Sequence, residues 1–194
     1  GSSGSSGSGN STGGSTGGTV VTPAPVPPAP TGAWRHDGRG WWYQYWAGGY
    51  PAGTWQFIEG AWYHFNGAGY METGWIRDGG AWYYLHGSGA MATGWLFSGG
   101  AWYYLDGGSG AMVTGWRMVG GTWYYLYGSG AMATGWLRDG GTWYYLHGSG
   151  AMATGWVQTG GTWYYLHGSG AMATNQWVED RYWVTGSGAW TDTR

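Results

Sequence analysis

The amino-acid sequence predicts an all-β protein, a β-solenoid of stacked β-hairpins with one repeat of about 20 residues in each hairpin. Three observations lead to this prediction: a repeat of fixed spacing, a composition dominated by Trp, Tyr and Gly, and a scarcity of charged residues. The 194 residues include 19 Trp, 17 Tyr and 45 Gly, and only 8% are charged. A short fixed period is typical of a solenoid, and so many glycines without a collagen period indicate frequent tight turns.

The composition also limits the core and the partners of the chain. Leu, Ile and Val are too few for an ordinary aliphatic core, so we expect Trp and Tyr to build most of it. The net charge of −2 provides no basic surface for nucleic acid or for an anionic membrane. The sequence contains no run of about 18 apolar residues, which a segment that crosses a bilayer would need. The absence of Cys excludes disulfides.

The N-terminal region differs in composition from the rest of the chain. Residues 1–7 read GSSGSSG, which is typical of an expression tag. Residues 8–33 are predicted to be a disordered linker, first rich in Gly and Ser and then Pro-rich, with TVVTPAPVPPAP at 19–30. Because such linkers separate folded units, we expect a further domain, of catalytic type, upstream in the full-length protein, and a signal peptide outside this sequence.

Residues 34–194 are predicted to form about seven repeats of this solenoid followed by a degenerate C-terminal cap. In each regular repeat one Trp follows Gly or Thr, and a second Trp opens a triplet that reads W-Y-Y in most repeats. Trp75 and Trp95 are 20 residues apart, whereas the unit that contains Asp106-Gly107-Gly108 carries one extra residue. A register kept over so many units outweighs local propensity in the assignment of the fold.

Each repeat is expected to form one hairpin. In the fifth repeat, Thr122–Leu126 has the aromatic content of a strand, Gly128-Ser129-Gly130 is expected to form the turn, and Ala131–Thr134 a shorter return strand. Gly140-Gly141 is expected to make a second turn. One such hairpin is marginally stable in water, so the hairpins should stack and bury each other's faces.

The two ends of the array depart from the pattern, as solenoid ends do. The first repeat reads Trp41-Trp42-Tyr43 at the triplet and has Pro51 where the other repeats have Met. In the last unit Arg181 replaces the Trp of the triplet and Trp190 replaces the Met.

The alternation of side chains along a strand predicts where the aromatic rings gather. Trp123 and Tyr125 should face one way, and Tyr124 and Leu126 the other. Each seam between repeats then collects two Trp from one repeat and one Tyr from the next. Three aromatic faces with few charges nearby suit a cation that cannot form hydrogen bonds, and quaternary ammonium is the usual guest of such a cage.

Units such as GWLRDGGTWYYLHGSGAMATGW resemble the choline-binding (cell-wall-binding) repeats of Gram-positive bacteria and their phages, and the resemblance covers roughly residues 34–190. It implies a β-solenoid that binds choline of teichoic acids between consecutive repeats. It also implies a cage made by the Trp of Gly-Trp, the Trp of W-Y-Y and the first Tyr of the following triplet.

Carried over position by position, the resemblance gives seven cages. Five come from regular repeats: Trp55, Trp62 and Tyr83; Trp75, Trp82 and Tyr103; Trp95, Trp102 and Tyr124; Trp116, Trp123 and Tyr144; Trp136, Trp143 and Tyr164. Two involve the irregular ends: Trp34, Trp42 and Tyr63, and Trp156, Trp163 and Tyr182. The sequence does not place Met91, Met112, Met132 and Met152 relative to the cages. Truncation of Trp102 to Ala is expected to cost ~3–5 kcal/mol, as for a core Trp.

The resemblance implies a non-catalytic module that captures choline or phosphocholine of teichoic acid and anchors an attached domain at the bacterial surface, where we expect the protein to be located. A glucan-binding module that stacks sugars on Trp and Tyr is the main alternative, and a purely structural stalk is a third reading. The second Tyr of each triplet is interpreted as packing: Tyr84, Tyr104, Tyr125, Tyr145 and Tyr165. The sequence leaves open whether the module forms a homodimer.

No enzyme, metal or cofactor is expected. Asp78 and Asp139 are three repeats apart, so they could not form the paired carboxylates of a glycosidase. One loop position is His in three repeats (His86, His147 and His167) but Asn66, Asp106 or Tyr127 in others. A metal site would not tolerate that exchange.

Overall fold

The computed structural model describes residues 28 and 30–194, so the expected tag and most of the expected linker lie outside the described residues. The described part of the chain consists of strands and loops, and it has no helix long and apolar enough to cross a membrane. The first strand begins at Gly32, two residues before the boundary expected at residue 34. The predicted all-β fold of repeated hairpins is confirmed.

Consecutive strands pair into eight antiparallel hairpins, one after the other. The first four are β1 (Gly32–Asp37) with β2 (Gly40–Tyr45), β3 (Thr54–Ile58) with β4 (Ala61–Phe65), β5 (Gly74–Asp78) with β6 (Ala81–Leu85), and β7 (Gly94–Ser98) with β8 (Ala101–Leu105). The next four are β9 (Gly115–Val119) with β10 (Thr122–Leu126), β11 (Gly135–Asp139) with β12 (Thr142–Leu146), β13 (Gly155–Thr159) with β14 (Thr162–Leu166), and β15 (Gln176–Val178) with β16 (Tyr182–Val184). A last strand, β17 (Trp190–Thr193), pairs with β16 and ends the array.

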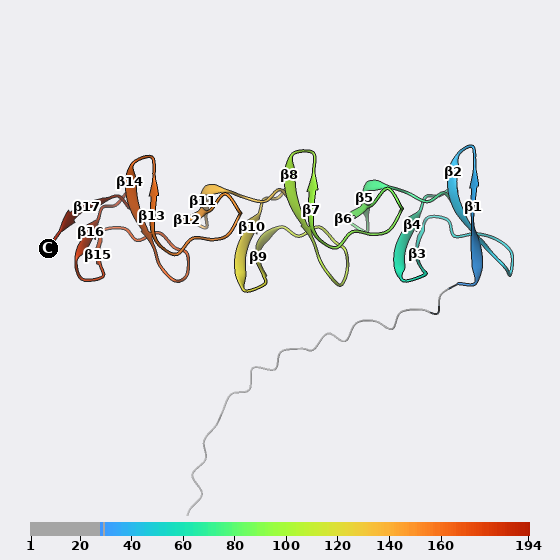
Figure 1. Cartoon of the computed structure of the whole chain (residues 1–194), viewed down its shortest axis with the longest axis horizontal. Coiled ribbons are helices and arrows are strands. Elements are labelled where there is room, and N and C mark those ends of the chain that lie inside the picture. Colours follow the sequence, from blue (N-terminus) through green and yellow to red (C-terminus); the bar gives the residue numbers. More distant parts are fainter. Residues whose placement is uncertain (1–27, 29) are drawn as a thin grey trace, which may run out of the picture.

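The hairpins form a rod and point in a recurring set of directions (Figure 1). The first, fourth and seventh hairpins (β1-β2, β7-β8 and β13-β14) project to the same side, and the second, fifth and eighth project to the opposite side in this view. Each hairpin is a separate two-stranded sheet, except that β17 extends the last one. The orientation therefore repeats after every three hairpins, and so do the surfaces that the repeats present.

The turn that closes each hairpin is not the one expected from the sequence. Thr122–Leu126 pairs with the preceding strand β9 through Gly120-Gly121, not with Ala131–Thr134. The predicted return strand was wrong, because only Met132 of that segment pairs with Leu126, in a single bridge. Gly120 and Gly121 have φ of 57° and 81°, and a two-residue turn with two positive φ angles matches the twist of a hairpin. The double glycine was thus the stronger turn signal.

The core centres on a line of leucines. Leu85, Leu105, Leu126, Leu146 and Leu166 are completely buried, one in each regular repeat, and Phe65 takes this place in the second hairpin. The expectation that Trp and Tyr build most of the core was wrong for its centre, where the rings pack around small aliphatic side chains. Each leucine lies opposite a glycine of the paired strand, as Leu126 lies opposite Gly115. The glycine is required by its backbone, because Gly115 has φ of 77°, a conformation that favours glycine.

Backbone hydrogen bonds from the loops connect one repeat to the next. The amide of Met132 donates to the carbonyl of Trp102 at 2.8 Å. The same bond recurs along the rod, from Met71 to Trp41, Met91 to Trp62, Met112 to Trp82, Met152 to Trp123 and Met172 to Trp143. The loop after each hairpin is therefore fixed to the preceding hairpin, beside the second Trp of that repeat.

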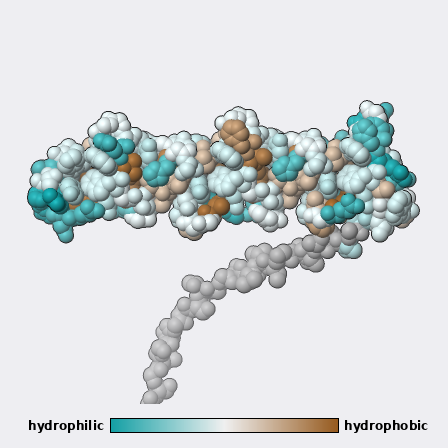
Figure 2. Space-filling view, in the orientation of Figure 1, coloured by the Kyte–Doolittle hydropathy of each residue, from teal (hydrophilic) through white to brown (hydrophobic). Residues whose placement is uncertain are grey.

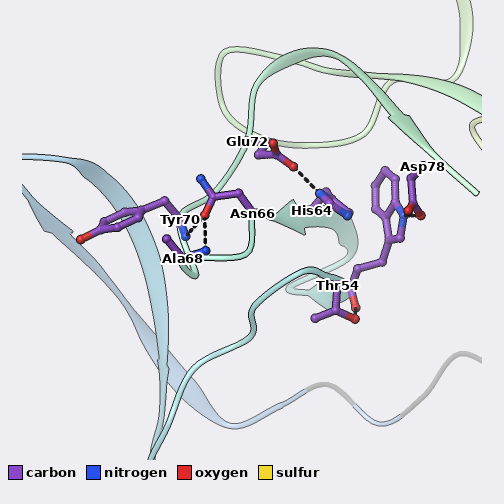
Figure 3. Close-up of polar contacts among 8 residues, drawn as sticks. Thr54, His64, Asn66, Ala68, Tyr70, Glu72 and Asp78 are labelled. Carbon is purple, nitrogen blue, oxygen red and sulfur yellow. Dashed lines mark hydrogen bonds and ion pairs between the residues drawn. The ribbon is translucent and has the colours of Figure 1, made fainter.

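The loop with the extra residue is organised by Asp106. Its Oδ1 accepts hydrogen bonds from the amides of Gly108 and Ser109, each at 3.0 Å, and its Oδ2 accepts one from Nη2 of Arg117 at 2.7 Å. The amide of Ser109 is the main cause that lowers the pKa of Asp106 below its ordinary value, against the opposing effect of burial. Asn66 accepts the corresponding amide bonds, from Ala68 and Tyr70, in its own loop (Figure 3).

Candidate ligand-binding site

A pocket in the middle of the rod shows how three consecutive repeats combine. Trp75 on β5 and Trp82 on β6 form two of its walls. Tyr103 of the next hairpin and Met112 of the following loop form a third. Gly128-Ser129, from the loop of the repeat after that, completes the lining. The sequence predicted the two Trp and the Tyr, but not the contribution of a third repeat.

The same set of residue types lines two further pockets. One is formed by Trp55, Trp62, Tyr83, Met91, Gly108 and Ser109, and the other by Trp136, Trp143, Tyr164, Met172, Gly186 and Ser187. The three cavities have volumes of 310 to 370 Å³, at the small end of ligand-binding cavities. The structure thus brings these three predicted triplets together, around a space that suits one small ligand.

Two further predicted cages show the same contacts between rings. The ring centroids of Trp95 and Tyr124 are 4.8 Å apart, as are those of Trp116 and Tyr144, in edge-to-face geometry. The second Trp of the first of these, Trp102, is 45% exposed. The expected stability cost of truncating Trp102 was therefore too high, because a half-exposed ring has much less apolar surface to lose than a core Trp.

In the first pocket the structure replaces one predicted residue. Trp41, not Trp42, lines this pocket together with Trp34, Tyr63, Met71 and Gly87-Ser88. His36 pairs with Trp41 across the hairpin, as Arg77 pairs with Trp82 in the third hairpin. Trp42 instead packs edge-to-face on Tyr50, with ring centroids 6.0 Å apart. The spacing could have shown this, because Trp41 follows Asp37 by four residues, as Trp82 follows Asp78.

The last pocket is closed by the C-terminal strand. Trp156, Trp163 and Tyr182 line it as predicted from the triplet pattern, together with Glu179 and Trp190. Trp190 on β17 stands where the other pockets have Met, and the bridge between Tyr164 and Ala189 attaches this strand to β14. The third strand of the terminal sheet therefore supplies the wall that a further repeat supplies elsewhere.

The eighth hairpin lacks a comparable cage. Arg181 stands where the regular repeats have the second Trp, and the first-Trp position is Trp177. The guanidinium carbon of Arg194 lies 4.4 Å from the centroid of the Trp177 ring, in the geometry of a cation–π interaction. The face of this Trp is thus occupied by a cation of the chain itself.

The second Tyr of each triplet packs within its own hairpin. Tyr84 is the cross-strand partner of Trp75, and their ring centroids are 5.2 Å apart. The corresponding pairs are Trp95–Tyr104, Trp116–Tyr125, Trp136–Tyr145 and Trp156–Tyr165, with centroids 5.0 to 5.2 Å apart. These tyrosines support the first Trp from behind, while the first Tyr of the next triplet lies on the pocket side.

The pockets offer aromatic and apolar surface and little charge. Figure 2 shows that strongly hydrophilic residues gather mainly near the two ends of the rod on this face, with hydrophobic patches between them. Within residues 30–194, His, Asp and Glu form no group of three that could hold a metal ion. The arrangement can therefore hold a small, partly apolar cation, but it has few polar groups with which to bind hydroxyls.

The central pocket includes Met112, and the loop after β10, which contains Gly128-Ser129 and Gly130, holds this Met in place. Gly130 has φ of 85°, and a Cβ atom at Gly130 would overlap the sulfur of Met112. Gly130→Ala is expected to strain the loop by ~1–2 kcal/mol and to push Met112 toward Trp82, which narrows one pocket. Titration with choline should then show one binding site fewer than in the unchanged chain. Gly67→Ala is the matched control and should keep every site, because Gly67 has the position of Gly128 in the loop of the second hairpin, a Cβ there meets no atom within 4 Å, and Gly67 lines none of the described pockets.

Comparison with known proteins agrees with this geometry. A family model described as "Choline-binding repeat" matches residues 52–93, 72–114, 113–154 and 138–177. One similar solved structure is CbpJ from Streptococcus pneumoniae TIGR4, with 48% identity and a TM-score of 0.77 over 83% of this chain and 58% of that one. Another is choline-binding protein F from Streptococcus pneumoniae, in the presence of a peptidoglycan analogue, with 44% identity and a TM-score of 0.77 over 84% of this chain and 58% of that one. A third is the modular autolysin LytC from Streptococcus pneumoniae, with 31% identity and a TM-score of 0.54 over 82% of this chain and 42% of that one.

The chain spans less than two thirds of the length of each of these solved structures. The comparison with curated proteins found no match.

Proposed function

The chain belongs to the choline-binding repeat family, and we propose that its repeats form a non-catalytic module that captures choline, as phosphocholine of cell-wall teichoic acid, in the pockets between repeats. The observation that carries this proposal is the recurrence of one pocket, with two Trp, one Tyr, one Met and a Gly-Ser loop, in four places along the rod. A core that only needed filling would not require half-exposed Trp rings at every repeat.

The chemistry of the pocket fits a trimethylammonium group. This group has no N–H to donate, so it needs electron-rich faces rather than hydrogen-bond acceptors, and Trp is the best such face. Trp82 and Trp143 are 42% and 41% exposed, so their rings are accessible to a ligand before binding. A sugar would instead require polar groups for its hydroxyls, and the four matching pockets offer mainly aromatic rings, Met and one Ser.

The number of pockets supports a role in anchoring. Single cages are expected to bind weakly, whereas several pockets on one rod can engage one polymer and gain avidity through effective concentration. We propose that the polymer is teichoic acid and that the linker expected at 8–33 joins the rod to a separate domain that it holds at the cell surface. The modular autolysin LytC, to which 82% of this chain is similar, supports the proposal that such a rod accompanies a separate domain.

A titration with three ligands tests the proposal. Choline is expected to bind at several sites, to change the Trp fluorescence and to give a heat of binding in a calorimetric titration. Its neutral isostere 3,3-dimethylbutanol should bind much more weakly, because it has the shape of choline without the charge. A glucan oligosaccharide should give no signal. A response to the glucan without one to choline would favour the polysaccharide-binding alternative, and silence from all three would leave a structural rod.

A further inference from the structure

The first Trp of several pockets donates a hydrogen bond to a carboxylate of the next hairpin. Nε1 of Trp55 lies 2.9 Å from Oδ2 of Asp78, and Nε1 of Trp116 lies 3.0 Å from Oδ2 of Asp139. Asp78 and Asp139 are the last residues of β5 and β11, next to the hairpin turns. Figure 3 shows the Asp78 carboxylate against the edge of an indole ring.

The last pocket has the same contact with a longer side chain. Nε1 of Trp156 lies 3.4 Å from Oε2 of Glu179, which directly follows β15 and also lines the pocket. Three pockets along the rod therefore have a carboxylate bonded to their first Trp.

The other pockets have no carboxylate at this position. Trp75 donates to the hydroxyl of Ser98 at 3.3 Å, and the corresponding residue for Trp136 is Thr159 at the end of β13. For Trp34 and Trp95 the corresponding strands, β3 and β9, end in Ile58 and Val119. The residue at the end of the next hairpin's first strand thus gives the pockets three chemical types: acidic, hydroxyl and aliphatic.

These types follow the geometry of the rod. The hairpin directions recur after every three repeats (Figure 1), so pockets that are three repeats apart face the same way. Asp78 and Asp139 belong to the second and fifth pockets, Ser98 and Thr159 to the third and sixth, and Ile58 and Val119 to the first and fourth. The pockets on one side of the rod therefore have an acidic residue at this position, and those on a second side have a hydroxyl residue. The pockets on the third side have an aliphatic residue, except the last, which has Glu179.

A carboxylate at this position acts on a bound cation in two ways. The hydrogen bond fixes the plane of the indole ring, and an acceptor with full charge makes this bond stronger than a neutral one would. The negative charge also attracts the cation that lies over the ring. At a separation of several ångströms near a protein surface, this attraction corresponds to a ~3- to 30-fold gain in affinity.

We propose that this residue sets the affinity of each pocket for a quaternary ammonium ion, and that Asp78, Asp139 and Glu179 make their three pockets the tight sites of the module. The inference rests on the proposed function, since it concerns the same ligand. Asp139 is half-buried whereas Asp78 is exposed, so salt screens Asp139 less. The Trp116 pocket should therefore be the tightest of the regular ones.

The Trp116 pocket is also the cleaner place for a test. At the Trp55 pocket a second acidic side chain is close, because His64 packs on Trp55 with ring centroids 4.9 Å apart and contacts Glu72 (Figure 3). In the fifth hairpin the cross-strand partner of Trp116 is Tyr125, which has no such carboxylate partner among its side-chain contacts. A change at Asp139 therefore alters one charge and leaves the nearby cations in their own contacts, Arg117 with Asp106 and Arg138 with the ring of Trp143.

Asp139→Asn isolates the charge, because the Asn carbonyl can still accept the indole hydrogen bond. In titrations at low salt, we expect one tight choline site to weaken by ~3- to 30-fold, and the loss to shrink at high salt. Binding of 3,3-dimethylbutanol should not change. Val119→Asp is the converse variant, and it should turn the Trp95 pocket from a weak site into a tight one. Thr159→Val is the matched control and should leave the tight sites unaffected.

The outcomes separate this inference from the function on which it rests. If the unchanged chain does not bind choline, the proposed function fails. If it binds choline but Asp139→Asn leaves affinity and salt dependence as they were, the proposed function stands and the inference is wrong. If Asp139→Asn weakens choline and 3,3-dimethylbutanol equally, the side chain only positions the ring, and the role of its charge is refuted.

Discussion

Trp82→Ala is expected to remove one choline site from the chain and to change its stability in the absence of ligand only slightly. Trp82 lines the central pocket and is 42% exposed, so a large part of its ring is open to a ligand. The loss of one Trp face costs a bound cation ~0.5–2 kcal/mol, which corresponds to a ~2- to 30-fold loss of affinity at that pocket. Calorimetric titration with choline measures this, and thermal unfolding without ligand measures stability.

Trp46→Ala is the matched control for this variant. Trp46 is 65% exposed and is absent from the lining of the five pockets described above, so its loss should leave the number of sites unchanged. An unaltered titration of Trp82→Ala would contradict the assignment of the central pocket as a binding site. A large loss of stability would instead mean that the ring serves mainly to pack the hairpins.

Leu126→Ala should have the opposite profile, with a large loss of stability. Leu126 is completely buried, and truncation of a buried Leu to Ala typically costs ~2–5 kcal/mol because it loses apolar burial and leaves a cavity. In a solenoid, stability is close to a sum over neighbouring repeats, so the damage should centre on the fifth repeat and separate the array into two halves. Urea unfolding followed by circular dichroism should show a lower midpoint or two transitions.

Met118→Ala provides the comparison for the leucine variant. Met118 is on the same hairpin but is 49% exposed, and its truncation should cost much less. Saturating choline should partly restore the midpoint of Leu126→Ala, because a ligand that binds only the folded state stabilises it. A cost below ~1 kcal/mol for Leu126→Ala would contradict the view that the leucine line is the centre of the core.

The sequence was most informative where its pattern repeats. The 20-residue spacing placed the first Trp of one repeat beside the first Tyr of the next, and their ring centroids are indeed 4.8 to 4.9 Å apart in the regular repeats. Trp42 was misplaced in the first pocket because that repeat has two adjacent Trp, and the order of residue types in the triplet favours Trp42 whereas the spacing from Asp37 favours Trp41. Pairing across the hairpin, which depends on the turn, makes the choice in favour of Trp41.

The remaining differences have their cause in three-dimensional packing. Both Gly120-Gly121 and Gly128-Ser129-Gly130 are plausible turns by composition, and the Met–Trp backbone bonds decide that the second is a loop between repeats. The part of the pocket that comes from Gly128-Ser129 depends on the rotation from one hairpin to the next. No local pattern encodes that rotation, which results from how buried side chains such as Leu126 pack between successive hairpins.

The construction of each pocket from three successive repeats has a consequence for how such a protein can change its valency. Every interior window of three repeats has the same architecture, whatever the residue at its strand end, so an in-frame duplication of one repeat unit is expected to create one new pocket and to break none. The last window is already closed by Trp190 on β17, so growth within the array does not require a new end. Binding capacity can therefore evolve in single steps by unequal recombination, and the residue at each strand end can diverge afterwards.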